Sequence, residues 1–245
     1  MLLSMLAAAV AVVLVLVLTG NGSRHQDGSP AGGGGGPVGA DDFHAGDTAL
    51  VVLDGVSGRI QLTADPHAHA VTGSFHRTDG TADRLRGRTV HDASAGRDAL
   101  EVGCEDQAGV RVPCAGDLVL TVPAHTGLRL RQTSGQAVLS GLGGDVTVDA
   151  SSIQLTTAGL RSRMAHFTVT SGSADLSFAG VPDDFDLHET SASVTAHLPH
   201  SPDGYAVATA ASSASTQVTV PRNSASAHRL SLAVTSGSLS VASAG

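Results

Sequence analysis

Thr133-Ser134-Gly135 is the first of three copies of one short phrase, which recurs as Thr170-Ser171-Gly172 and Thr235-Ser236-Gly237. A stretch of alternating apolar and polar residues precedes each copy, and another follows it. Such alternation is typical of a strand that buries one face. Glycine reaches positive φ without steric cost, and Ser and Thr hydroxyls bond to nearby backbone groups, so the phrase predicts a bend. The C-terminal half is therefore expected to repeat a strand, a bend and a strand.

The repeat has a period of roughly 20 residues when one alternating face of each unit is placed in register. The inward faces of the units begin at Leu128, Val146, Phe167, Phe185, Tyr205 and Leu230. This pattern predicts an all-β fold, a β-solenoid or β-helix-like stack. Each coil is expected to hold at least two strands and to lie on the coil before it in the sequence. Val56-Ser57-Gly58 resembles an early, diverged copy of the bend.

Shorter apolar runs in the N-terminal half also predict strands. They cover residues 49–53, 58–63, 70–75, 100–104 and 118–122. Pro123, Pro199 and Pro221 are each expected to close a strand, because proline withholds an amide donor. No convincing amphipathic helix follows the apolar N-terminal segment.

The composition excludes some classes of partner. The chain has 245 residues, enough for one sizeable domain and a targeting segment. Its formal net charge of −8 opposes binding to a phosphate backbone, so nucleic acid is not an expected partner. The chain has no Trp, one Tyr and five Phe, so it has few aromatic side chains that could stack on sugars or anchor a protein interface. Surface recognition is expected to be polar or based on shape.

The N-terminal segment is almost wholly apolar from Met1 to Leu18, which is long enough to cross a bilayer. We expect residues 1–19 to be a transmembrane anchor, with a cleaved signal segment as the alternative. Residues 20–44 are rich in Gly and Ser and predict a disordered linker. Residues 45–245 form the expected β-solenoid domain, with the repeats clearest over 124–245. The expected location is the cell membrane, single-pass, with the domain outside the cytoplasm, or secretion if the segment is cleaved.

Cys104 and Cys114 are the two cysteines of the chain, and the turn formers Gly109 and Pro113 lie between them. A turn there could bring two strand ends together, and an oxidising envelope would let a disulfide close. Two free buried thiols and half of a metal site are the other interpretations. The ten-residue spacing and the lack of a nearby second pair of ligands oppose zinc. We therefore expect a disulfide in an exported domain.

The repeated Thr-Ser-Gly units, the strand Leu118-Val119-Leu120-Thr121-Val122-Pro123 and the hydrophobic segment ahead of them resemble a bacterial family of unknown function labelled putative adhesin. The resemblance covers roughly residues 45 to 245 and rests on motifs of low complexity. It implies a β-solenoid-like fold exposed at the cell envelope, and it brings no catalytic residues. The spacing around Ala211 to Ser215 departs from the pattern, so the bend is hard to place there.

The sequence offers few candidates for chemistry, and we expect no catalytic, cofactor-binding or metal-binding residue. His67 and His69 would share one face of a strand, and His197 lies near His200, but neither pair has an evident third ligand. Glu189 stands on the inward register and is either a buried acid or a strand-end residue that reaches water.

An acidic cluster and two serine or glycine motifs are the other candidates in the sequence. Asp183, Asp184 and Asp186 could offer oxygen ligands to calcium, although a solvated acidic loop is the commoner explanation. Gly55-Val56-Ser57-Gly58 has the wrong spacing for a nucleophile elbow. Gly141-Leu142-Gly143-Gly144 precedes a strand and therefore suits a turn better than a phosphate cradle.

The function expected from the sequence is a non-enzymatic, membrane-tethered module for adhesion or protein interaction at the bacterial cell envelope. Its partners would be the membrane, through the N-terminal helix, and a cell-surface or envelope protein. One alternative is a domain that senses envelope stress or regulates a neighbouring membrane protein. Another is an enzyme acting on polysaccharides, since parallel β-helices also host lyases and hydrolases, but those need several carboxylates gathered in a groove.

Overall fold

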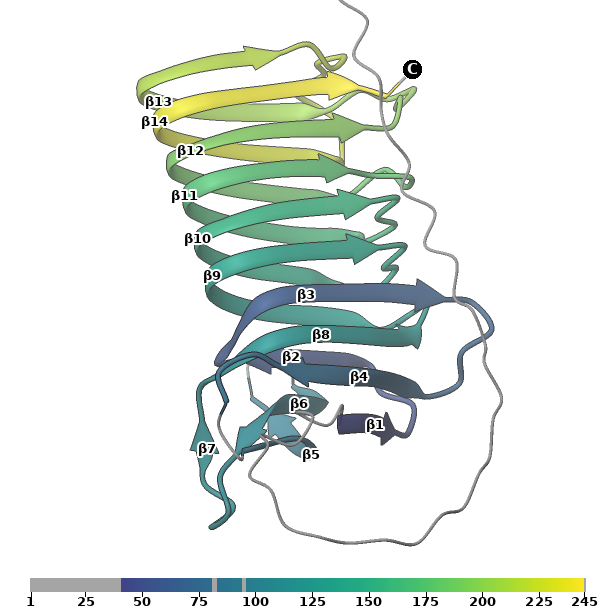
Figure 1. Ribbon diagram of the computed structural model, residues 1–245. Coiled ribbons are helices and arrows are strands. Elements are labelled where there is room, and N and C mark those ends of the chain that lie inside the picture. Colours follow the sequence, from purple (N-terminus) through teal and green to yellow (C-terminus); the bar gives the residue numbers. More distant parts are fainter. Residues whose placement is uncertain (1–40, 81–82, 94–95, 245) are drawn as a thin grey trace, which may run out of the picture. The chain divides into compact units, whose positions relative to one another are not determined.

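Six long strands carry the repeat in the computed structural model, which describes residues 41–80, 83–93 and 96–244 (Figure 1). They are β9 (Gly127–Ser140), β10 (Val146–Ala158), β11 (Met164–Ser177), β12 (Asp184–Leu198), β13 (Ala206–Val218) and β14 (Arg229–Ser243). Each is paired in parallel with its neighbours, and the described residues form one large mixed sheet of 14 strands. The all-β expectation is confirmed.

Each long strand bends in its middle, and in β9, β11 and β14 the bend lies at the Thr-Ser-Gly phrase that predicts it. Gly135, Gly172 and Gly237 have φ values of 117°, 108° and 119°, and Gly58 of the early copy has 98°. The ladder skips one residue at the bend and then resumes, so one bent strand replaces the two or more strands expected for each coil. We call the residues before the bend the first arm and those after it the second arm. Figure 1 shows the bends together along one side of the stack.

The interior of the stack is built from the inward face that the alternation predicts. In β11, for example, Ala165, Phe167 and Val169 are buried before the bend, and Ala174 and Leu176 are buried after it. The same positions are apolar in most neighbouring strands, because in-register parallel pairing places equivalent residues above one another. Burial of these side chains is the main favourable contribution to the stability of the stack.

The order of the strands in space is not the order in the sequence, and this corrects the expectation that each coil lies on the one before it. From β9 to β12 the two orders agree, but β14 lies between β12 and β13. The composition explains the exchange. Leu230, Leu232 and Val234 of β14 have neighbours on both sides and are buried, whereas Thr209 and Ala211 of β13 lie at the end of the stack and are exposed.

The other end of the stack is built from shorter strands. They are β1 (Asp41–Ala45), β2 (Leu50–Asp54), β3 (Val56–Asp65), β4 (Val71–Arg77), β5 (Arg84–Asp92), β6 (Arg97–Glu105), β7 (Arg111–Val112) and β8 (Cys114–Pro123). The five strands expected in this half correspond to β2, β3, β4, β6 and β8. Strands β2 and β3 together form the level next to β9, and β6 and β8 form the level beyond them. Spatial and sequence order are therefore exchanged at this end as well.

Antiparallel strands cover this N-terminal end. Strand β4 pairs with β8, β1 pairs with β4, and β5 pairs with β6. Residues 41–44 belong to β1, so the strand begins inside the stretch that was expected to be linker. The rest of the linker and the expected anchor, residues 1–40, lie outside the described residues. The described ranges contain no helix with the length and hydropathy that a membrane crossing needs.

A disulfide joins Cys104 at the end of β6 to Cys114 at the start of β8, with the two Cα atoms 6.0 Å apart. The segment between them turns at Gly109 and forms β7, which pairs back onto β6. The bridge therefore ties together the two strands that form one level of the stack. It agrees with the pairing that the turn formers between the cysteines indicated.

Candidate interaction faces of the stack

The second arms present a face of uncharged polar side chains. Because the register is parallel, equivalent outward residues lie in one row across the sheet. We call this set the hydroxyl row: Gln136, Gln154, Ser173, Ser193, Ser238 and Ser215. All of them except Gln136 are exposed, and Ser238 donates a hydrogen bond to Ser193 at 3.2 Å. Strands in a sheet are about 4.8 Å apart, so the row repeats hydroxyl and amide groups at that spacing.

The serines of two bends form hydrogen bonds to the neighbouring strand. Ser171 Oγ donates to the carbonyl oxygen of Ser151 at 2.8 Å and lies 3.0 Å from Ser152 Oγ. Ser236 Oγ makes the same two contacts with Thr190 and Ser191, at 2.8 and 3.0 Å. These hydroxyl pairs satisfy backbone groups where the ladder is interrupted. The Thr-Ser-Gly phrase therefore has a structural role in the bend.

The first arms present a face with more charge. His166 Nδ1 lies 3.0 Å from Asp186 Oδ2, and His188 Nε2 lies 3.2 Å from Asp186 Oδ1. Arg129 pairs with Asp92, and Arg97 lies 3.7 Å from Asp145. A groove of about 780 Å³ runs along this face, and its lining includes Arg97, Asp145, His166, Asp184 and Asp186.

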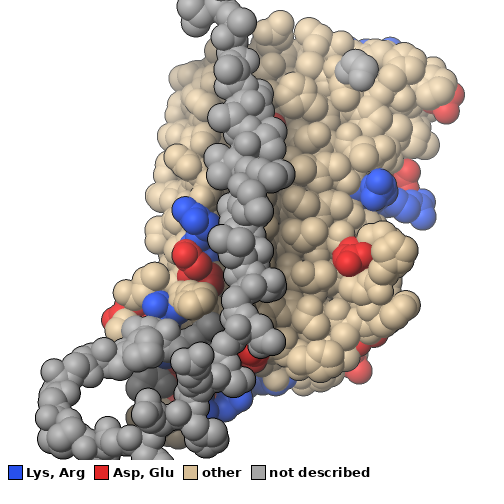
Figure 2. All heavy atoms as spheres, turned by 45° about the vertical axis from the view of Figure 1, so that its right-hand side comes forward, with Lys and Arg blue, Asp and Glu red and all other residues tan. Residues whose placement is uncertain are grey.

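Charged groups are few on the side of the molecule that Figure 2 presents. Most of the visible surface there is uncharged, and the blue and red atoms gather in separate small groups. Such a surface suits recognition by hydrogen bonds and shape, as the composition indicated.

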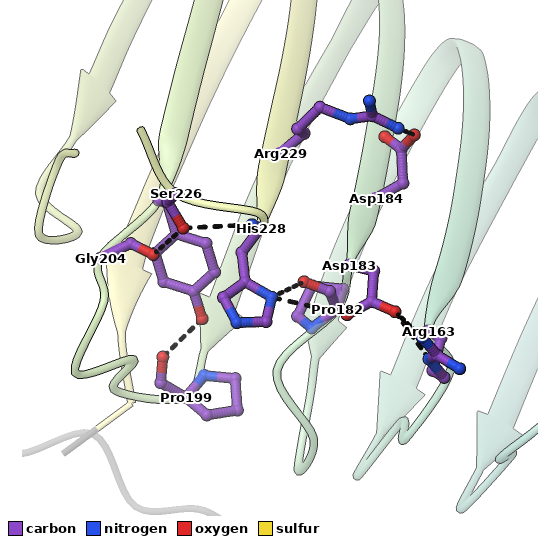
Figure 3. Close-up of polar contacts among 10 residues, drawn as sticks. Arg163, Pro182, Asp183, Asp184, Pro199, Gly204, Ser226, His228 and Arg229 are labelled. Carbon is purple, nitrogen blue, oxygen red and sulfur yellow. Dashed lines mark hydrogen bonds and ion pairs between the residues drawn. The ribbon is translucent and has the colours of Figure 1, made fainter. Parts of the chain in front are cut away.

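The three aspartates whose oxygens could serve as calcium ligands each have a different partner. Asp183 pairs with Arg163 at 2.6 Å and Asp184 pairs with Arg229 at 2.8 Å (Figure 3). Asp186 lies between two histidines, His166 and His188. Each carboxylate thus has its own cationic or imidazole neighbour. Within the described ranges, no group of three or more His, Cys, Asp or Glu side chains is placed to hold a metal ion.

The loops around His228 hold the inserted strand β14 in place (Figure 3). His228 Nδ1 lies 3.1 Å from the carbonyl oxygen of Pro182 and 3.6 Å from Asp183 Oδ1, both just before β12. Ser226 Oγ donates to the carbonyl oxygen of Gly204, just before β13, at 2.8 Å. Tyr205 is buried and donates its hydroxyl to Pro199 O at 2.7 Å, and burial raises the pKa of this phenol. This network is structural, because it joins the loops of three adjacent strands.

The candidate histidines do not come together. His67 and His69 lie in the exposed turn between β3 and β4, not on one face of a strand as expected. The turn forms because Asp65 Oδ1 accepts a hydrogen bond from the His67 backbone N–H at 2.8 Å, and Ala68 N–H bonds back to Asp65 O. His197 is the half-buried penultimate residue of β12, and His200 is exposed in the loop that follows.

Glu189 is a buried acid inside the stack, with only 2% of its surface exposed. Neither carboxyl oxygen has a hydrogen-bond partner of normal geometry. Burial raises the pKa of Glu189 to about 7, and the nearby backbone amides of Ala192 and Ser238 moderate the rise. Gln132 holds the equivalent position in β9, but its amide donates to the carbonyl oxygens of Gly58 and Ser134 at 2.9 and 3.1 Å.

No family model matches the sequence, and no curated protein matches it. The structure does match solved structures over most of the chain. One is "a putative cell adhesion protein" from Clostridium sporogenes, at 9% identity and a TM-score of 0.49, covering 84% of this chain and 100% of that one. Another is "a putative adhesin" from Bacteroides fragilis, at 14% identity and a TM-score of 0.38, covering 83% and 96%.

A third match is "a putative adhesin" from Parabacteroides merdae, at 12% identity and a TM-score of 0.34, covering 84% of this chain and 97% of that one. These proteins are similar to the chain over most of its length. At such identities and scores, the likeness carries no conclusion about what this chain binds.

Proposed function

We propose that the chain is a non-enzymatic module for adhesion or protein interaction at the bacterial cell envelope, built as a β-solenoid and tethered to the membrane by residues 1–19. The hydroxyl row carries this proposal. It is a regular array of donors and acceptors, exposed except at Gln136, on the outside of a stack whose interior is built mainly from buried apolar side chains. The disulfide between Cys104 and Cys114 supports a location outside the cytoplasm, because such bonds persist in oxidising compartments.

The row is tested by placing charge and bulk on it. We expect Ser173→Arg/Ser193→Arg to remove most attachment of cells that carry the full chain, because two long cations interrupt the array on adjacent strands. Ser231→Arg is the matched control, since Ser231 is also exposed but lies on the first arm of β14. Attachment is measured in a gene deletion strain complemented with each variant. Equal attachment of both variants would contradict a role for the row.

The regulatory alternative predicts a different phenotype. If the module senses envelope stress or docks a neighbouring membrane protein, deletion of the gene should lower survival under envelope stress and leave attachment unchanged. Both readouts are taken from the same deletion strain, so the two versions are separated in one experiment.

A polysaccharide-acting enzyme is the second candidate, and the groove on the first arms is the observation that favours it. The carboxylates there are held in ion pairs, Asp184 with Arg229 and Asp145 with Arg97. A glycosidase needs two carboxyl groups free to act as acid and as base or nucleophile. Release of new reducing ends from cell-wall polysaccharide by the full chain, lost in Asp186→Asn, would favour the enzyme.

A further inference from the structure

Strand β13 leaves one edge of the sheet open at the C-terminal end of the stack. Among the described residues it pairs with β14 alone. Figure 1 shows it as the outermost strand at that end. An open edge presents a row of backbone donors and acceptors that can pair with another strand.

Three of the inward side chains of β13 are also uncovered. Thr209, Ala211 and Thr216 are exposed, although the equivalent residues of β14, Leu232, Val234 and Leu239, are buried. One further strand laid on β13 would cover these side chains and complete the interior.

Charge protects the strand edges at the opposite end but not at this one. Within the part of the chain that the structure describes, β5 pairs only with β6, and it carries Arg84, Arg86, Arg88 and Asp92. Strand β1, whose partner among the same residues is β4, carries Asp42. By contrast, the 13 residues of β13 contain no charged residue, no proline and no glycine. Proteins use charges and proline on edge strands to prevent pairing, so the edge of β13 lacks the usual protection.

The sequence of β13 is nearly the same in both directions about its bend. Reading outward from the centre between Ser212 and Ser213, the paired positions are Ser212 with Ser213, Ala211 with Ala214, Ala210 with Ser215, Thr209 with Thr216, Ala208 with Gln217, and Val207 with Val218. The ladder skips Ser212, so the bend lies at this same centre. Inward residues are therefore matched with inward residues: Val207 with Val218, Thr209 with Thr216 and Ala211 with Ala214.

We propose that β13 pairs antiparallel with β13 of a second copy of this chain, so that two stacks join end to end about a two-fold axis through the bend. An interface about a two-fold axis must be complementary to itself, and an antiparallel strand pair meets this condition when its sequence is palindromic. The first arm of one copy lies on the second arm of the other, and the two interiors become continuous. The protected strands at the far end stop the growth at a dimer.

The register is tested by disulfide cross-linking in the full chain. Ala210 and Ser215 are exposed outward residues, and the pairing places Ala210 of one copy opposite Ser215 of the other. Directly opposed residues in an antiparallel pair are within reach of a disulfide. Both native cysteines are already bonded to each other, so the new thiols are the only free ones.

Cells that coexpress Ala210→Cys and Ser215→Cys chains should yield a covalent dimer under mild oxidation. Cells with Ala210→Cys alone should not, because the two copies of residue 210 lie on opposite faces of the joined stack. Cross-linking of Ala210→Cys to itself at the same yield, or no cross-link in either case, would overturn the proposal.

A charge-pair series tests the energetics without touching the interior. Ala210→Lys/Ser215→Lys places lysine opposite lysine twice in the dimer, whereas Ala210→Lys/Ser215→Glu places lysine opposite glutamate twice. Within one copy the two positions lie on different arms and point outward, so neither variant alters the fold of the stack.

Sedimentation velocity of the full chain in density-matched detergent gives the dissociation constant. We expect the dissociation constant of the Lys/Lys variant to be at least about fivefold higher than that of the Lys/Glu variant. Like charges directly opposite each other on paired strands repel, whereas opposite charges attract. Equal constants for the two variants, or a wild-type chain that is monomeric at every concentration, would contradict the pairing. This readout does not depend on attachment, so it can fail while the proposed function holds.

Discussion

Gly172→Ala is expected to lower the free energy of unfolding by at least about 3 kcal/mol, because both the backbone angle and the space at this bend require glycine. Gly172 has a φ of 108°, outside the left-handed region that other residues adopt at modest cost. A Cβ there would lie 2.1 Å from the carbonyl oxygen of Ile153 in the neighbouring strand. That oxygen belongs to the backbone of β10, so the contact can be relieved only by moving two paired strands apart.

Gly159→Ala is the matched control for this effect. Gly159 has a φ of 64°, and a Cβ at this position would have its nearest neighbour at 3.9 Å. The variant therefore measures the cost of a positive φ alone, about 1 kcal/mol. Both variants are compared by urea unfolding of the full chain. A loss in Gly172→Ala no larger than that in Gly159→Ala would show that close approach of the strands does not restrict this bend.

The same reasoning explains why the phrase is not complete in every unit. The bend position is Gly in β9, β11 and β14 but Ile153 in β10 and Ala192 in β12. A Cβ at Gly172 would meet the carbonyl oxygen of Ile153, and a Cβ at Gly237 would lie 2.0 Å from the carbonyl oxygen of Ala192. In each such pair of neighbouring strands, only one of the two bend residues must be glycine. The incomplete copies of the phrase, with Ile153 or Ala192 at the bend, are therefore compatible with the fold.

Local patterns were sufficient to predict the bends, the inward face and the cysteine pair. Alternation fixes which side chains point inward, and the Thr-Ser-Gly phrase fixes where the chain turns, because both depend on neighbours in the sequence. The positive φ of Gly58 shows that the diverged copy Val56-Ser57-Gly58 also forms a bend, as its sequence predicts.

These local patterns could not predict the order of the strands in the sheet. All of the long strands share one register, so any parallel neighbour satisfies the pattern equally well. The exchange of β13 and β14 depends instead on the sizes of the inward residues, for example Leu232 in β14 and Thr209 in β13. The alternation of apolar and polar residues shows which side chains point inward but not how large they must be. Contacts that follow from the exchange, such as Arg229 with Asp184 across 45 residues, were therefore missed. Their signal in the sequence is the run of small and hydroxyl residues in β13.

Glu189→Gln is expected to stabilise the protein by about 3 kcal/mol at pH 8, because it removes a carboxylate from the buried interior of the stack. Gln132 shows that an amide is accommodated at the equivalent position of β9, where it donates to two carbonyl oxygens of the bend. The folded state prefers the protonated acid, since burial raises the pKa of Glu189 from 4.5 to about 7. Stability from this group is thus fully present below about pH 4.5 and is lost as the pH rises toward 7.

Urea unfolding of the wild type and of Glu189→Gln across pH 4 to 8 measures this difference. The two proteins should be about equally stable near pH 4, where Glu189 is protonated in both the folded and the unfolded chain, and should diverge between pH 4.5 and 7. Glu105→Gln is the control, because the Glu105 carboxylate is near the surface with Arg111 4.0 Å away, and it should bring no gain at pH 8. A difference between wild type and Glu189→Gln that stays constant across this range would mean that the carboxylate is solvated, and the interior of the stack would then be open to water at this bend.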